Sequence, residues 1–167
     1  MAELAERDMK AVNLAQRRIA SQAFTALFQQ GMDLVEQTAI YLDGDGRIES
    51  HDLPRPILHA YVQQSMRLST RLMQLASWLL LQRAVAEGEM SPADARREGA
   101  KIDLEGPARD EDAEAMLPEG LRALIGRSFD LQRQIRQLDA ALDEPTEEQL
   151  NPVAGQIGRL RTAFERR

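Results

Sequence analysis

The chain has 167 residues, a length that suits one domain and leaves little room for a second. Hydrophobic residues make up 43% of it and charged residues 29%, whereas aromatic residues account for only 4%. This composition, rich in Ala, Leu, Gln, Arg and Glu, favours long helices over strands. The formal net charge is −6, and the chain contains no cysteine, which excludes disulfides and thiolate metal sites.

The negative charge is concentrated in one connector, residues 89–119, which holds ten acids and four bases. The rest of the chain has no basic excess to neutralise phosphates, so nucleic-acid binding is not expected. The most apolar run, residues 72–81, is about half the length that a bilayer requires and lies between Arg71 and Arg83. The first twelve residues lack the apolar core of a secretory signal. We therefore expect no membrane insertion and a cytoplasmic location.

The first half of the chain predicts one long helix with a thinner extension before it. Apolar residues from Phe24 to Leu42 recur with the 3.6-residue period of a helix that buries one face. This pattern predicts a helix over about residues 21–43, ending where Gly44 can take the left-handed conformation. Residues 1–19 are helical in composition, but their apolar stripe is thin. We expect them to form a weakly ordered N-terminal arm or a frayed extension of the helix.

A second long helix is predicted over about residues 56–87, because Pro54 and Pro56 are tolerated only at a helix start. Apolar and small residues in this segment recur on one predicted buried face: Ile57, Tyr61, Ser65, Leu68, Leu72, Leu75, Ala76, Leu79 and Val85. Trp78, Met66 and Met73 are interpreted as core residues at helical spacing. A ligand pocket lined by them is the alternative.

The remaining elements complete an all-α fold. Ser91 followed by Pro92 indicates the start of a short helix that reaches about Gly99. The acidic connector 89–117 ends in a stretch rich in Gly, Pro and like charges, which predicts a mobile acidic loop. A third long helix is predicted over about residues 118–142. The expected architecture is an antiparallel three-helix bundle over residues 20–145, with a short extra helix, an acidic loop and a flexible C-terminal tail.

Residues 41–52 resemble part of a calcium-binding loop between two helices. In that register, loop positions three, five, six, eight and twelve are filled by Asp43, Asp45, Gly46, Ile48 and Asp52. Position one is Tyr41 and the last ligand is a short Asp, which weakens the site. We interpret the segment as a helix closed by glycine and followed by a polar turn. A calcium-responsive bundle is the alternative.

The two histidines, His51 and His59, have no further His or Cys with which to build a metal site. No cofactor is expected, and no nucleophilic triad is present, so no catalytic residue is predicted. His59 lies near the start of a long helix, where phosphotransfer domains carry their phosphoacceptor. Those domains place Lys three residues further on, where this chain has Val62. We interpret His59 as structural or solvated, and keep a two-component phosphotransfer protein as an alternative function.

Two features are candidates for binding a partner protein. Arg67 and Arg71 lie one helical turn apart and present two cations to a partner's carboxylate, unless they pair with neighbouring acids. Residues 146–167 form a tail whose four apolar residues recur at helical spacing: Val153, Ile157, Leu160 and Phe164. Glycines weaken this segment as a free helix. We expect it to order only against its own bundle or a partner's groove.

Three strings resemble the regulator-of-CtrA-degradation family of alphaproteobacteria: GMDLVEQTAIYLDGDGR (31–47), SMRLSTRLMQLASWLLLQRAVAEGEM (65–90) and NPVAGQIGRLRTAF (151–164). The likeness covers about residues 20–165, and the middle string is the most specific. It implies a three-helix bundle that forms a homodimer and acts as a non-enzymatic cytoplasmic adaptor, with the cell pole as one place of action.

The resemblance also implies a process. Such adaptors join the ClpXP protease through a response-regulator primer and deliver cell-cycle regulatory proteins, such as a CtrA-like response regulator, for degradation. The family's tail is flexible and needed for delivery, in agreement with the amphipathic segment 146–167. The resemblance assigns no catalytic residue.

Overall fold

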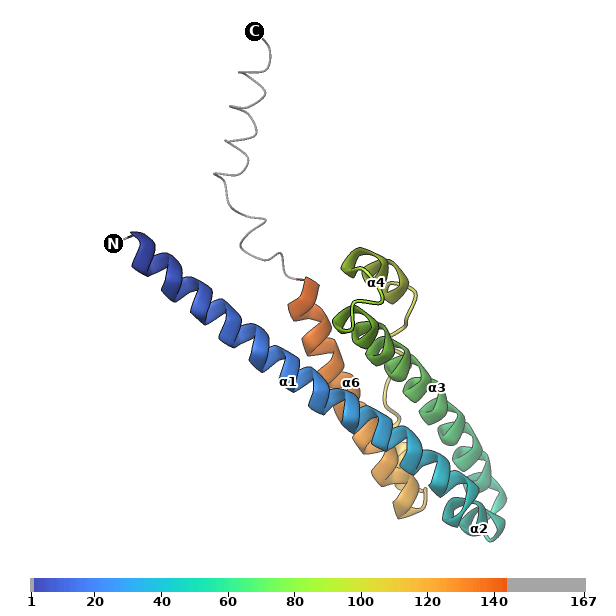
Figure 1. Cartoon of the computed structure of the whole chain (residues 1–167). Coiled ribbons are helices and arrows are strands. Elements are labelled where there is room, and N and C mark those ends of the chain that lie inside the picture. Colours follow the sequence, from blue (N-terminus) through green and yellow to red (C-terminus); the bar gives the residue numbers. More distant parts are fainter. Residues whose placement is uncertain (1, 144–167) are drawn as a thin grey trace. The chain divides into compact units, whose positions relative to one another are not determined.

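The structure is a computed structural model that describes residues 2–143, with side chains described from residue 21 onward. The described part is all-helical (Figure 1), which confirms the predicted fold class. Its helices are, in chain order, α1 (Ala2–Asp43), α2 (Asp45–His51), α3 (Arg55–Ala86), α4 (Pro92–Gly99), α5 (Glu111–Ala115) and α6 (Glu119–Asp143). The chain divides into two units, residues 1–135 and 136–167, and the packing described below lies within the first.

Residues 2–20, whose weak order stays a prediction, continue the helix, so α1 begins at Ala2 rather than near residue 21. Their content of Ala, Glu, Arg and Leu explains this, because these residues have high helix propensity. The helix ends at Asp43, and the amide of Gly44 donates to the carbonyl of Ile40 at 2.9 Å. Gly44 has φ −109°, so the predicted left-handed closure is wrong. A Cβ there would lie 2.9 Å from the Ile40 carbonyl oxygen, and this close approach explains the glycine.

α2 occupies the segment that resembles a calcium loop. Residues Asp45–His51 are helical, so their backbone does not encircle an ion, and the calcium-loop alternative is wrong, as is the polar turn. Instead, α2 packs closely at Gly46, where a Cβ would lie 2.6 Å from Tyr41 Cε1 and 2.7 Å from Tyr61 Oη. The Tyr41 hydroxyl donates to Glu49 at 2.7 Å. Burial, and then the contact with Glu49, raise the pKa of Tyr41.

The relative directions of α1, α3 and α6 follow from the residues that these three long helices bring into contact. At one level Tyr41 of α1 packs against Gly120 at the start of α6, and at another Gly31 of α1 contacts Leu79 of α3 and Leu131 of α6. α1 therefore runs antiparallel to both α3 and α6, and these two run parallel to each other. A parallel pair needs a long crossover, which explains why 32 residues, 87–118, separate α3 from α6.

The core lies between the facing stripes of α1, α3 and α6. Its most fully buried side chains are Leu34, Leu68, Leu75, Trp78, Leu79, Leu121, Ile125, Ser128, Leu131 and Ile135. Trp78 is a core residue, as predicted, and the edge of its ring system meets Phe24 of α1 at a centroid distance of 6.5 Å. Met66 and Met73 are 67% and 65% exposed, so their assignment to the core is wrong. They lie on the opposite side of α3 from the buried stripe.

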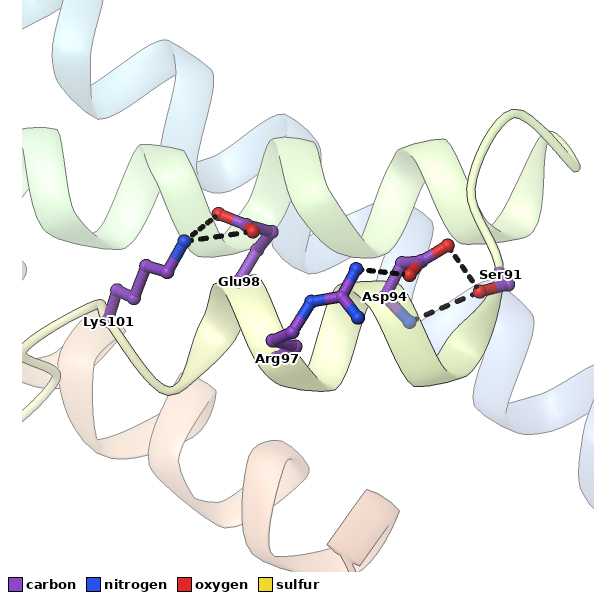
Figure 2. Close-up of polar contacts among 5 residues, drawn as sticks. All are labelled: Ser91, Asp94, Arg97, Glu98 and Lys101. Carbon is purple, nitrogen blue, oxygen red and sulfur yellow. Dashed lines mark hydrogen bonds and ion pairs between the residues drawn. The ribbon is translucent and has the colours of Figure 1, made fainter.

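α4 begins where the sequence predicts, because Ser91 caps it. The Ser91 hydroxyl accepts from the Asp94 amide at 3.1 Å. Figure 2 shows Asp94 paired to Arg97 within the helix, and Glu98 paired to Lys101, which follows the helix. Exposed pairs of this kind contribute little to stability. The helix is instead fixed by its cap and by the burial of Ala95.

The acidic connector beyond α4 is packed against the bundle, unlike the mobile loop that its composition predicts. Asp103 accepts from the amides of Glu105 and Gly106 at 3.1 and 3.0 Å, closing a tight turn. The side-chain amide of Gln132 in α6 donates to the carbonyls of Leu104 and Glu105 at 2.8 and 2.6 Å. Composition alone does not predict these contacts, because they join backbone carbonyls of the connector to a single side chain of α6.

Candidate interaction surface

The outward face of α3 carries a row of exposed apolar side chains, here called the α3 stripe: Val62, Met66, Met73 and Leu80. Their exposed fractions are 49%, 67%, 65% and 53%, and their spacings of four, seven and seven residues place them along one line of the helix. From Val62 to Leu80 the stripe runs about 27 Å at 1.5 Å per residue. In the described residues it is the longest exposed apolar row on one helix.

Small hydroxyl residues fill the spaces between the large ones without adding free polar groups. The Ser69 hydroxyl donates to the carbonyl of Ser65 at 2.9 Å, and the Ser77 hydroxyl donates to that of Met73 at 2.8 Å. Both donors are therefore satisfied within α3, and a partner that covers them leaves neither unpaired. The stripe combines large flexible side chains with short ones, a surface onto which another helix packs closely.

The structure separates the two arginines that the sequence assigns to partner binding. Arg71 is only 8% exposed; its Nη1 donates to the Ser128 hydroxyl at 2.9 Å, and its guanidinium lies 3.6 Å from the centroid of the Phe129 ring. Burial lowers the pKa of Arg71, although nearby Glu114 opposes that shift. Arg71 is thus an interior residue and is not placed to grip a partner's carboxylate. Arg67, one turn earlier, is half-buried beside the α3 stripe.

A second arginine holds α5 against the same ring. Arg109 makes a bidentate pair with Glu114, in which Nε donates to Oε1 at 3.1 Å and Nη2 donates to Oε2 at 2.8 Å. Its guanidinium lies 5.2 Å from the Phe129 centroid, and Glu114 is 5% exposed. The hydrogen bonds to Glu114 raise the pKa of Arg109. The guanidinium groups of Arg71 and Arg109 therefore both lie close to the Phe129 ring, and the Glu114 carboxylate provides a negative charge beside them.

A groove of about 450 Å³ opens beside this pair. Five charged side chains and two alanines line it: Arg109, Glu111, Glu114, Glu119, Arg122, Ala115 and Ala123. Sites for small organic ligands are mostly apolar with a few polar groups. Most residues that line this groove are charged, and two of them, Arg109 and Glu114, form the ion pair that holds α5.

The histidines do not come together with other ligand residues. His51 ends α2 and His59 lies on the outward side of α3, and both are exposed. Among residues 2–143 no group of three or more His, Cys, Asp or Glu side chains lies close enough to hold a metal ion. Within the same residues, no helix is both long and apolar enough to cross a bilayer.

The tail residues Val153, Ile157, Leu160 and Phe164 lie outside the described residues. Their assignment to partner binding stays a prediction. The α3 stripe was missed by the sequence analysis, although a signal exists. Met66, Met73 and Leu80 are spaced by seven residues, and this spacing indicates a second seam on a helix whose other face is already apolar.

Together these features define a class of protein: an all-helical bundle with one long helix that has a packed face and an exposed apolar one. Exposed apolar rows on an otherwise well-packed protein mark protein–protein interaction sites.

Comparison with known proteins places the chain more narrowly. The model of a family described as a protein of unknown function, DUF1465, matches residues 15–164. The crystal structure of RcdA from Caulobacter crescentus CB15 is similar, with 46% sequence identity and a TM-score of 0.61, over 74% of this chain and 92% of that one. No curated protein matches. The chain belongs to this family, the RcdA family.

Proposed function

We propose that the chain is a non-enzymatic adaptor that binds a protease–primer complex and delivers cell-cycle regulatory proteins to the ClpXP protease. The observation that carries this proposal is the 46% identity with RcdA over most of the chain. The resemblance to the regulator-of-CtrA-degradation family supplies the process. The exposed α3 stripe supports it, since an adaptor needs a surface that its own fold leaves uncovered.

The proposed partners are proteins. ClpXP is reached through a response-regulator primer, the cargo includes a CtrA-like response regulator, and the chain pairs with itself as a homodimer. This work takes place in the cytoplasm, with the cell pole as one location. In this proposal the bundle binds one partner, while the tail, residues 146–167, contacts the cargo or the protease.

Deletion of residues 146–167 tests whether the tail has a role in delivery that is separate from that of the bundle. We expect far-UV helicity and melting to change little, because the buried apolar side chains described above lie between Leu27 and Ile135. We expect stimulated degradation in a reconstituted ClpXP assay to be lost.

A matched control keeps the length of the tail and replaces only its apolar residues, Val153, Ile157, Leu160 and Phe164, with serine. Loss of delivery in both variants assigns the function to the apolar face, and loss in the deletion alone assigns it to tail length. Normal degradation with both variants would contradict the proposed role of the tail. Absence of any stimulation by the full chain, with primer and cargo present, would contradict the adaptor function itself.

A further inference from the structure

α3 differs from the rest of the chain in charge. The chain has 27 acidic residues, yet none of them lies in the 32 residues of α3. The basic residues of this helix are Arg55, His59, Arg67, Arg71 and Arg83. Arg71 is buried. The exposed surface of α3 is therefore apolar in its centre and carries only groups of positive or neutral charge.

Arg67 and Arg83 lie beside the α3 stripe, whereas Arg55 lies in line with it, two turns before Val62. At 3.6 residues per turn, Arg67 and Arg83 lie about 100° to either side of the line through Met66. Arg83 pairs with Glu87 at 2.8 Å and its guanidinium lies 4.9 Å from the Phe28 centroid. Arg55 and Arg67 have no ion-pair partner among residues 21–143, whose ion pairs involve other residues. Two cations thus remain available along an apolar seam.

We infer that the α3 stripe binds an amphipathic helical segment of a partner protein, one with an apolar face flanked by acidic side chains. This inference rests on the proposed function and names the chemistry of one adaptor partner. Apolar side chains of the partner pack on Met66, Met73 and Leu80, and its carboxylates meet Arg55 and Arg67. Methionines suit this role because their unbranched, polarisable side chains adapt to different apolar partners.

A second copy of α3 fits the same surface poorly. It matches the apolar stripe, but it brings arginines and a histidine toward the same residue types and supplies no acid. Like charges placed across an interface disfavour association, whereas complementary charges favour it. A length of about 18 residues suffices for the partner helix, since it spans the stripe at 1.5 Å per residue.

Two synthetic peptides of equal length provide the test. One has leucines at helical a and d positions with glutamates on both flanks, and the other has lysine in place of every glutamate. Binding to the full chain is measured by fluorescence anisotropy at low and high salt. We expect the glutamate peptide to bind at least about tenfold more tightly at low salt, and this preference to shrink at high salt because screening weakens exposed charge pairs.

Variants of the protein locate the binding site. Met73→Glu places a carboxylate in the centre of the stripe at a 65% exposed position, so the core is left intact. We expect it to weaken binding of the glutamate peptide by at least about tenfold. Met116→Glu is the matched control, because Met116 is also exposed, at 51%, but follows α5. It is expected to bind within about twofold of wild type. Far-UV circular dichroism checks that both variants are folded.

Several results would overturn the inference. Equal affinity of the wild-type chain for the two peptides would contradict the charge selectivity. Equal binding of the glutamate peptide by the wild-type chain and Met73→Glu would contradict the location of the site. Light scattering provides a third such result. If the wild-type chain is a dimer that the Met73→Glu substitution dissociates and the glutamate peptide does not, a second copy of the chain occupies the α3 stripe. Any of these three results, together with stimulated degradation by the full chain, would contradict the inference about the α3 stripe but not the proposed adaptor function.

Discussion

The two faces of α3 differ in what covers them, and adjacent leucines show it. Leu79 is completely buried against α1 and α6, whereas Leu80 is 53% exposed. Trp78 and Arg71 share the inward side, and Met66 and Met73 share the outward one. Both sides are apolar in sequence, so hydrophobicity alone does not tell them apart. The inward face is buried in the bundle, and the outward face is the one that we propose binds another molecule.

The largest expected effect comes from truncating the inward leucine. Leu79→Ala removes a fully buried side chain and leaves a cavity, so we expect it to lower the free energy of unfolding by about 2–5 kcal/mol. Leu80→Ala is the matched control one residue away and is expected to change it by less than about 0.5 kcal/mol. Urea unfolding followed by circular dichroism measures both. Equal effects would break the distinction between the two faces.

Loss of the ion pair between Arg109 and Glu114 is expected to lower the free energy of unfolding by a smaller amount. Glu114→Gln removes the buried charge that balances Arg109 and lies near Arg71. We expect a loss of about 1–2 kcal/mol, the lower range for hydrogen bonds to charged groups, because Arg109 is 41% exposed. Glu111→Gln, exposed in the same helix, serves as control and is expected to be nearly neutral. A neutral Glu114→Gln would mean that α5 is held without this pair.

The smallest expected effect is a pH dependence of stability that comes from Tyr41, which packs against Gly46 of α2 close to Tyr61 of α3. Burial and Glu49 raise the pKa of Tyr41, so the folded protein holds the phenolic proton more tightly than the unfolded chain. The resulting stability is present below the unfolded pKa of about 10 and is lost as pH rises above it. Tyr41→Phe has no such proton, so we expect its midpoint in urea to fall less between pH 9 and pH 11. Parallel falls in both proteins would contradict this.

Helical periodicity was sufficient to predict the fold class and much of the core. In the second predicted helix, Leu68, Leu72, Leu75 and Leu79 are buried as their spacing indicates. The assignment of Met66 and Met73 to the core failed because α3 carries two apolar faces, and their spacing places them on the outward one. It also failed for Arg71, since a charged residue is rarely buried unless partners such as Ser128 and Phe129 surround it.

The candidate site was harder to predict than the fold. The sequence pointed to tail residues outside the described part and to a pair of arginines, of which the structure leaves Arg67 beside the surface. The α3 stripe emerged only when exposed fractions were known.

Local sequence determined where α3 and α4 begin, because the prolines and the Ser91 cap act within a few residues, whereas it missed the start of α1 and the whole of α2. It also determined that α3 contains no acid. Tertiary structure alone decided that α3 and α6 run parallel, that Gln132 binds the connector backbone, and which apolar face of α3 is covered. These outcomes depend on contacts between residues far apart in sequence, and no local pattern encodes which of two suitable faces will meet a neighbour.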